Sequence, residues 1–340
     1  MSTMDTSPTF GGLAKPKTLA AWFAVAVLVF LALVPPLTDL IGQSFYLKVG
    51  TRIVIMAIAA VGLNLVLGYG GMVSFGHAAY IGIGAYCAAI PIYHGYEVGF
   101  GHILLAIGFS ALFALITGAI SLRTKGVHFI MITMAFSQMA YYFFISLEGY
   151  GGDDGLPLPY GANSEFPLGF NISDRWTMYY TAFVSLLVVL YLSYRLVNSR
   201  FGRVIRGSKS NERRMQALGY PTYRYRLTAY VLSGVICGYA GVLLVNYTTF
   251  ISPEMMGWTR SGELIFMVVL GGTATMLGPV YGVMTFILLA EFLPDLMDFF
   301  YDGSGTYWHL PFGILLLVIV LFTRGGINGL LRWLGQGGSR

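Results

Sequence analysis

A series of long, almost uncharged apolar runs dominates this chain and decides its fold class. Hydrophobic residues make up 56% of the 340 residues and charged residues only 10%, far below the roughly 25% charged content of a soluble domain. About 20 apolar helical residues span a bilayer core of about 30 Å, and lipid offers unpaired backbone groups no hydrogen-bond partner. The runs therefore predict an all-α integral membrane protein and exclude a water-soluble globule.

Ten intervals are apolar enough to be membrane segments, so the chain is expected to form a polytopic helical bundle. Their approximate bounds are Leu19–Leu40, Gly50–Leu67, Phe75–Tyr93, Ile103–Leu122, Val127–Leu147, Thr177–Leu196, Leu227–Asn246, Gly262–Leu270, Pro279–Phe299 and Leu310–Thr323. The eighth interval is the shortest and ends at Gly271 and Gly272. It predicts a half-helix or a broken helix.

The distribution of Lys and Arg sets the expected orientation. With a cytoplasmic N-terminus, ten alternating spans place 16 of the 20 basic residues inside, nine of them from Arg195 to Arg226. The four that fall outside are Lys48, Arg52, Arg175 and Arg260. The net charge of +5 therefore reflects membrane topology and a basic inner face for anionic lipid or a protein partner, and not nucleic-acid binding.

Two Gly-rich segments interrupt the apolar pattern in a similar way. Gly68–Gly71 leads into Ser74 and His77, and Gly271–Gly272 leads into Gly278–Pro279. Such breaks mark the pathway in transporters, because half-helix ends offer unpaired N–H and C=O groups to a polar solute. The two breaks are interpreted either as parallel repeats or as a chance match in a Gly-rich chain.

Polar side chains within apolar segments are costly and are candidates for a solute pathway. The candidates are Asn64, Ser74, His77, Thr133, Ser137 and Gln138. Each also has a structural interpretation: a nearby backbone carbonyl could satisfy His77, the Ser and Thr hydroxyls could bond to their own helix, and Gln138 could bond between helices. Glu291 is expected near the outer surface.

The segment from Asn198 to Arg226 is too long and too patterned to be a simple connector. Asn211 can cap a helix over about 212–218, whose first turn carries Glu212, and Gly219 suits the left-handed residue just after its end. Met215 and Leu218 share one face of this helix. The spacing leaves two interpretations open, a docking element for another protein or a basic loop on anionic headgroups.

The sequence carries no signature of an enzyme or of a bound cofactor or metal. Ser208 stands between Gly207 and Lys209, so the Gly-rich stretch before it is not a nucleotide-binding loop. The His and Cys residues are scattered, and no H-E-x-x-H or G-x-S-x-G motif occurs. If ATP drives transport here, hydrolysis must take place on another chain.

Four blocks stand in one order along the chain. They are G-L-N-L-V-L-G-Y-G-G-M-V-S-F-G-H-A-A-Y-I-G-I-G-A-Y (62–86), V-H-F-I-M-I-T-M-A-F-S-Q with the later G-G-D-D-G-L (127–138 and 151–156), Phe201–Gly241, and S-P-E followed by V-V-L-G-G-T-A-T-M-L-G-P-V-Y-G (252–282). Together they resemble the M-type permease subunits of ATP-binding-cassette importers for branched-chain amino acids.

This resemblance implies several partners. They are a second, H-type permease, two cytoplasmic ATPases that bind ATP and Mg, and a periplasmic substrate-binding protein. It also implies that the segment 198–226 engages an ATPase. The residues assigned to this coupling, with Met215 added from the helix pattern, are Gly202, Arg203, Arg206, Asn211, Glu212, Met215, Ala217, Leu218 and Gly219. The chain departs from the family pattern at two places. Gly207–Ser210 stands where the family commonly has an Ala-Ile-Arg run, and Ala274 replaces a usual Gly.

The expected function is that of a transmembrane permease subunit in the bacterial inner membrane with both termini cytoplasmic. The expected organisation is a mobile tail (1–18), a transmembrane permease domain (19–323) and a cytoplasmic C-terminal tail (324–340). Within the permease domain lie a periplasmic loop (148–175) and a cytoplasmic coupling loop (198–226). We expect a weakly binding passage with few charged groups, with selectivity held by the binding protein. The alternatives are an importer for urea or short amides and an ion-coupled secondary transporter, which would need buried ionisable residues.

Overall fold

The computed structural model describes residues 19–96, 98–159, 164, 174–300, 304–322 and 325–330. The predicted N-terminal tail, much of the loop 148–175 and most of the C-terminal tail lie outside these ranges. The helices are α1 (Leu19–Ile41), α2 (Ser44–Asn64), α3 (His77–Tyr93), α4 (Gly99–Ser121), α5 (Val127–Ile145), α6 (Arg175–Asn198), α7 (Arg200–Ser210), α8 (Glu212–Ala217), α9 (Thr222–Thr248), α10 (Trp258–Gly271), α11 (Gly278–Phe300) and α12 (His309–Phe322). The short elements are η1 (Leu65–Tyr69), η2 (Glu148–Tyr150), η3 (Pro253–Met256), η4 (Ser304–Tyr307), β1 (Leu156–Pro157) and β2 (Phe250–Ile251).

Each of the ten predicted membrane intervals contains a helix. Seven helical segments in the described part of the chain are long and apolar enough to cross a membrane, namely α1, α2 with η1, α4, α5, α6, α9 and α11. Helices α3, α10 and α12 have 17, 14 and 14 residues, so a count of ten spans is not confirmed. The chain is a polytopic helical membrane protein.

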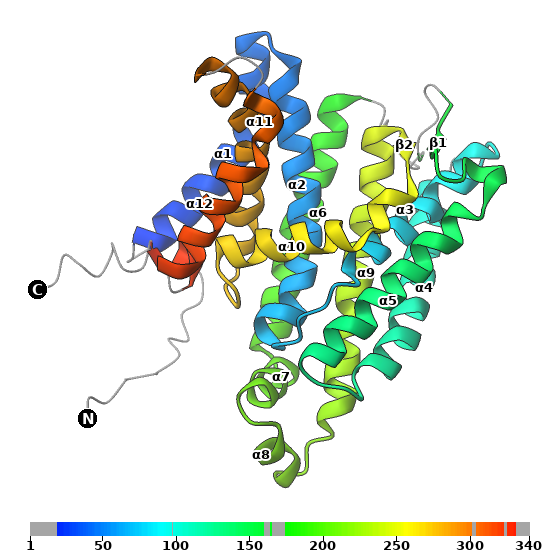
Figure 1. The fold of residues 1–340 in the computed structure, drawn as a ribbon, viewed down its shortest axis with the longest axis vertical. Helices are drawn as coiled ribbons and strands as arrows, with labels where there is room; N and C mark the ends of the chain where they lie inside the picture. The colour runs from blue at the N-terminus through cyan, green and yellow to red at the C-terminus, as the bar shows by residue number, and fades with distance from the viewer. Residues whose placement is uncertain are drawn as a thin grey trace, which may run out of the picture.

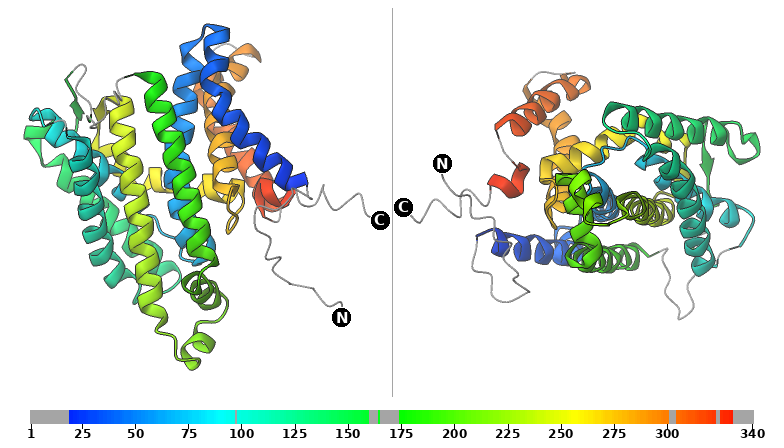
Figure 2. Two further views of the ribbon diagram at one scale, coloured as in Figure 1. Left: turned by 180° about the vertical axis from the view of Figure 1, so that it is seen from behind. Right: turned by 90° about the horizontal axis from the view of Figure 1, so that it is seen from below.

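Helices α2 and α9 form the centre of the bundle (Figures 1 and 2). In their most apolar stretches 89% and 61% of the residues are buried, against 22–39% in the other five long helices. Helix α3 packs directly on α9, because a Cβ on Gly84 would meet the backbone of Gly238 and one on Gly241 would meet the carbonyl of Ile81. These glycines therefore serve close helix packing.

Helix α10 lies crosswise to α2, between the two ends of the bundle (Figure 1). It corresponds to the short eighth interval and begins four residues earlier than predicted. Its C-terminus passes into a turn in which Gly272 and Ala274 have φ values of +115° and +59°. The second predicted break is therefore a left-handed turn between α10 and α11.

Helix α7 corrects the interpretation of 198–226 as a loop. Gly202, Val204, Ile205 and Ser208 are buried on one face of α7, while Arg203, Arg206 and Lys209 are exposed on the other. The spacing 201, 204, 205 and 208 is that of an amphipathic helix. The four basic residues among its eleven concealed this pattern at the sequence level.

Strands β1 and β2 form a two-residue antiparallel pair that was not predicted. Leu156 pairs with Ile251 and Pro157 with Phe250. The pair lies at the end of the molecule opposite α8 (Figure 1), and it connects the segment after α5 to the end of α9. The chain reaches β2 through Thr249, whose φ is +51°.

Candidate functional site

Helix α8 forms the tip of one end of the molecule, and local capping fixes its bounds. The Asn211 side chain accepts a hydrogen bond from the Arg214 N–H at 3.0 Å, which satisfies one of the free N–H groups of the first turn. Beyond the helix, Gly219 has φ +84° and the Tyr220 N–H donates to the Met215 carbonyl at 3.1 Å. This is a glycine C-cap, so the predicted helix at 212–218 is confirmed to within one residue.

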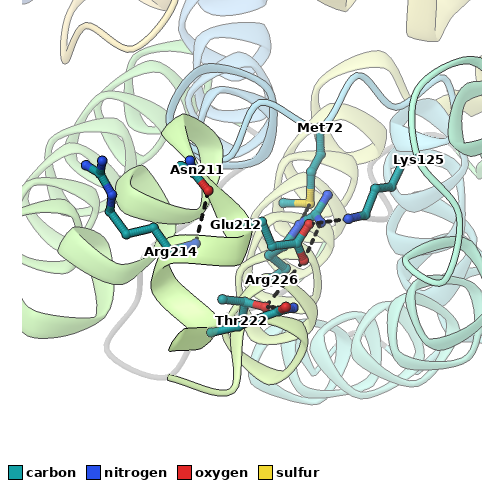
Figure 3. Close-up of polar contacts among 8 residues, drawn as sticks. Met72, Lys125, Asn211, Glu212, Arg214, Thr222 and Arg226 are labelled. Carbon is teal, nitrogen blue, oxygen red and sulfur yellow. Dashed lines mark hydrogen bonds and ion pairs between the residues drawn. The ribbon is translucent and has the colours of Figure 1, made fainter. Parts of the chain in front are cut away.

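Glu212 connects α8 to two other elements (Figure 3). Its carboxylate lies 2.6 Å from the Lys125 Nζ in the α4–α5 turn and 3.4 Å from an Arg226 guanidinium nitrogen on α9. It also accepts a hydrogen bond from the Thr222 hydroxyl at 3.3 Å. A displacement of α8 is thus resisted by, and transmitted to, both α9 and the α4–α5 turn.

The electrostatics of Glu212 favour its charged form. Burial alone would raise the pKa of this carboxyl, but the hydrogen bond from Lys125 and the charges of Arg226 and Lys125 outweigh burial, so the pKa lies below its ordinary value. The carboxylate is therefore ionised at neutral pH, and both ion pairs are present.

Helices α7 and α8 pack on each other and on the first break. A Cβ on Gly207 would meet the Met215 side chain, so the missing side chain at 207 allows α8 to lie close. The Lys209 ammonium donates to the Gly68 carbonyl at 2.7 Å. Gly68 lies in η1, a π-helical turn of the kind that often occurs at functional sites. Lys209 therefore connects the α7–α8 pair to the end of α2.

The remaining residues assigned to coupling either hold α7 against α6 or face outward. A Cβ on Gly202 would meet the Val197 carbonyl, and the Arg206 guanidinium donates to that same carbonyl at 3.0 Å, so both hold α7 against α6. Arg203, Ala217 and Leu218 are exposed, Leu218 to 66%. An exposed Leu beside the exposed Arg213 and Arg214 gives α8 an apolar point within a basic surface.

Asn64 joins the two predicted breaks to each other. Its amide nitrogen donates to the Thr275 carbonyl at 2.8 Å, and its amide oxygen accepts from the Ala274 N–H at 3.1 Å. The side chain is 2% exposed. Asn64 therefore links the end of α2 to the turn between α10 and α11, more than 200 positions away.

His77 is fully buried between two hydroxyls and not beside a backbone carbonyl. Its ring nitrogens lie 2.9 Å from the Ser74 Oγ and 3.0 Å from the Ser233 Oγ, and Ser233 donates its proton to the Gly62 carbonyl at 2.6 Å. Nε2–H must then donate to Ser233, and Nδ1 accepts from Ser74. This arrangement holds a neutral imidazole between α3, α9 and α2.

The other three pathway candidates, Thr133, Ser137 and Gln138, lie on α5. Thr133 donates to the Ile130 carbonyl at 2.9 Å and accepts from the Phe75 N–H at 3.2 Å, and Ser137 donates to the Met256 carbonyl at 2.7 Å. Both are fully buried, and Gln138 is half-buried. Five of the six candidates thus bond to the protein's own groups, and their role in solute passage stays a prediction.

Three residues of this site were not singled out in the sequence. They are Lys125, Lys209 and Arg226, which bring the α4–α5 turn, η1 and α9 to the α7–α8 pair. Only the cluster of positive charge on one predicted side of the membrane pointed to them. Within the described residues, no group of three or more His, Cys, Asp or Glu side chains is placed to hold a metal ion.

Comparison with known proteins gives consistent matches. Residues 45–321 match the family described as "Branched-chain amino acid transport system / permease component". The chain is 26% identical over 306 residues to the high-affinity branched-chain amino acid transport system permease protein LivM of Escherichia coli (strain K12), covering 84% of this chain and 70% of that protein.

Two further relatives differ in coverage. The probable branched-chain amino acid transport permease protein LivM of Methanocaldococcus jannaschii is 25% identical over 319 residues, covering 79% of this chain and 89% of that protein. The autoinducer 2 import system permease protein LsrC of Yersinia pseudotuberculosis is 26% identical over 207 residues, covering 57% and 55%. The branched-chain amino acid permeases therefore match more of the chain.

Proposed function

This chain belongs to the family of permease components of branched-chain amino acid transport systems, and on that premise we propose its role in transport. It forms, with a second permease subunit, the passage of an ATP-binding-cassette importer for branched-chain or closely related amino acids. Separate ATPase subunits, which bind ATP and Mg, drive transport through this passage. A substrate-binding protein outside the cell delivers the solute.

The observation that carries this proposal is the position and bonding of α8. The helix protrudes at one end of the bundle (Figure 1) and presents the exposed Leu218 with Arg213 and Arg214. A short helix with an apolar point suits a groove on another protein. Glu212 bonds α8 to α9 and the α4–α5 turn, and Lys209 of the adjoining α7 bonds to η1. A partner that moves α8 together with α7 therefore acts on all three.

The mechanism is alternating access driven from the α8 end. Closure of the ATPases shifts α8, and the shift reaches α9 through Glu212 and Arg226 and the end of α2 through Lys209. Asn64 then carries the movement of α2 to the turn after α10. The ATPases bias the equilibrium between two packings of these helices to the extent that they bind one more tightly.

The orientation follows from the same end of the molecule. Lys125 lies against α8, and α7, α8 and the start of α9 carry a dense set of basic residues. The positive-inside rule assigns this end to the cytoplasm. The opposite end, with β1 and β2, then faces outward, where a binding protein delivers solute.

The solute assignment rests on the share of this chain that each group of relatives matches. The LivM relatives match 84% and 79% of this chain, and the LsrC relative matches 57%. We therefore favour a branched-chain amino acid over an autoinducer-like solute.

Uptake of labelled L-leucine by cells that express the chain with its co-purifying partners tests this proposal. Gly219→Pro forces φ to about −65° where the chain needs +84°, so the C-cap of α8 is lost and uptake should fall while membrane insertion is retained. Gly95→Pro is the matched control, since Gly95 has φ +80° at the far end of α3 and, like Gly219, has open space around its Cα.

Three outcomes would contradict the proposal in different ways. Normal uptake by Gly219→Pro contradicts coupling through α8. An assembled wild-type complex that binds ATP but does not import L-leucine contradicts the solute assignment. Uptake by this chain alone, without ATPases, identifies an ion-driven transporter instead.

A further inference from the structure

A cavity of about 750 Å³ lies between α2, α10, α11 and α12, separate from the α7–α8 pair. This volume is within the range of about 300–1,000 Å³ that is usual for small-molecule sites. Arg52, in the cavity wall, is eight residues from the start of α2, or about 12 Å along the helix. The cavity thus lies in the half of the bundle that faces away from α8.

Four charged side chains of both signs line this one cavity. Arg52 faces Glu291 across 3.9 Å between α2 and α11, and Arg260 bonds to Glu263 within α10 at 3.1 Å. The positive and negative charges are equal in number. The four side chains are 30–49% exposed, so they face the cavity space and are not enclosed in the packed core.

The ion pairs are weak enough to exchange partners. A distance of 3.9 Å is at the limit of an ion pair, and exposed pairs contribute little to stability because water screens them. In a membrane protein, however, charged side chains among apolar helices are costly and usually functional. The four groups therefore need an explanation beyond holding the helices together.

The remaining wall is aromatic and aliphatic and is already formed. Phe286 and Phe312 are 7% and 6% exposed and pack edge to face with ring centroids 5.0 Å apart, while Trp308 packs against Phe312 at 5.4 Å. Leu316 is also buried there. This surface offers a branched aliphatic side chain an apolar contact beside the charged groups.

We propose that this cavity is a transit site for a zwitterionic α-amino acid. The Arg52 guanidinium binds the solute carboxylate and the Glu291 carboxylate binds its ammonium group, because these two side chains form the longer of the two ion pairs, at 3.9 Å against 3.1 Å. The aromatic wall formed by Phe286, Trp308 and Phe312 receives the aliphatic side chain. The proposal rests on the proposed function and adds the residues that contact the solute. Because the bonds replace existing weak ion pairs, the solute is held only loosely, as passage requires.

Neutral variants of the complete transporter separate a binding role from a structural one. Glu291→Gln leaves Arg52 without its counter-charge, whereas Arg52→Gln with Glu291→Gln removes the whole pair, which is nearly neutral for a purely structural pair. We expect both to lower L-leucine uptake by at least about tenfold, the effect of losing one charged hydrogen bond to the solute. Arg175→Gln with Glu254→Gln is the control, because both residues are exposed and lie outside the cavity.

Thiol protection tests the same site with all four charges kept. Ala290→Cys places a thiol in the cavity wall, in a background in which Cys87 and Cys237 are replaced by Ala. Saturating L-leucine should slow modification by a membrane-impermeant thiol reagent by about tenfold. Leucinol, which lacks the carboxylate, and 4-methylpentanoate, which lacks the ammonium group, should give no protection.

The outcomes distinguish this proposal from the proposed function. Wild-type complex that does not import L-leucine refutes the function. If the wild type imports L-leucine, normal uptake by the Arg52→Gln and Glu291→Gln double variant refutes the transit site alone. Equal protection of Ala290→Cys by leucinol refutes recognition of a zwitterion.

Discussion

Replacing Glu212 by Gln removes the negative charge that connects α8 to Lys125 and Arg226. The lost interactions are the ion pairs with Lys125 and Arg226, whereas the hydrogen bond from the Thr222 hydroxyl can be kept by the amide oxygen. The amide of Gln keeps the size of the side chain and can still accept a hydrogen bond, so the change tests the charge and not the packing.

The two ion pairs contribute unequally, in the reverse order of their distances. The Lys125 side chain is 69% exposed, so water screens this short pair and it contributes about 0.5 kcal/mol. Arg226 and Glu212 are only 16% and 19% exposed, and a partly buried guanidinium without its counter-charge costs about 1–3 kcal/mol. We therefore expect Glu212→Gln to weaken the docking of α8 by about 1.5–3.5 kcal/mol, about tenfold or more in its equilibrium constant.

The assay is the number of L-leucine molecules imported per ATP hydrolysed by the reconstituted transporter. A six-residue helix has little stability of its own, so α8 loses its fixed position while the bundle stays folded. The ratio should fall at least tenfold for Glu212→Gln and Arg226→Gln and less than threefold for Lys125→Gln. Glu254→Gln, at the other end, should leave the ratio unchanged. A wild-type ratio for Glu212→Gln, or a larger effect of Lys125→Gln than of Arg226→Gln, would refute this reasoning.

Three further expectations follow from the same contacts. Ala274 has φ +59°, so Ala274→Gly should relieve the left-handed strain and add about 0.5–1 kcal/mol of stability, while Ala274→Val should lower the stability. Thermal unfolding in detergent measures the stability of both variants, and a less stable Gly variant contradicts the strain. Asn64→Ala leaves the Ala274 N–H and the Thr275 carbonyl unpaired at a cost of about 2–4 kcal/mol, so amide exchange at 272–277 should accelerate, and unchanged protection would show that Asn64 does not link the breaks. Because the pKa of Glu212 is lowered, its ion pairs stabilise the folded protein fully above the ordinary pKa of 4.5, and this stabilisation is lost as pH falls through the lower folded pKa. Amide protection of α8 should therefore be constant from pH 8 to 5. A loss of protection between pH 7 and 5 would contradict the ion pairs assigned to Glu212.

Local chemistry made much of the fold predictable. The apolar runs located a helix in each of the ten intervals, because a membrane segment must satisfy its own backbone bonds. The cap residues Asn211 and Gly219 located the ends of α8, because helix capping depends only on a few neighbouring residues. The resemblance supplied what spacing alone left open, a protein partner for α8.

Helix α7 was missed although its signal was present. Its buried residues follow the helical spacing, but its high content of Arg and Lys suggested a solvated loop. The two-residue pair of β1 and β2 was missed because strands of this length have no sequence period.

The candidate site was harder to predict because its contacts join distant parts of the chain. A polar residue in an apolar segment can line a pathway or bond between helices, and the sequence does not tell which face it occupies. Asn64 and His77 bond within the protein, whereas the charged cavity combines Arg52, Arg260 and Glu291 from three helices that no local pattern relates.

The most direct test of coupling through α8 is photo-cross-linking from Leu218→Cys, with a photoactivatable reagent attached to the thiol, in the assembled transporter. We predict that this thiol cross-links to an ATPase subunit in inside-out vesicles, that ATP binding changes the yield, and that an impermeant thiol reagent added to intact cells does not reach it. Labelling of Leu218→Cys from outside intact cells, with no cross-link to an ATPase, would contradict the account.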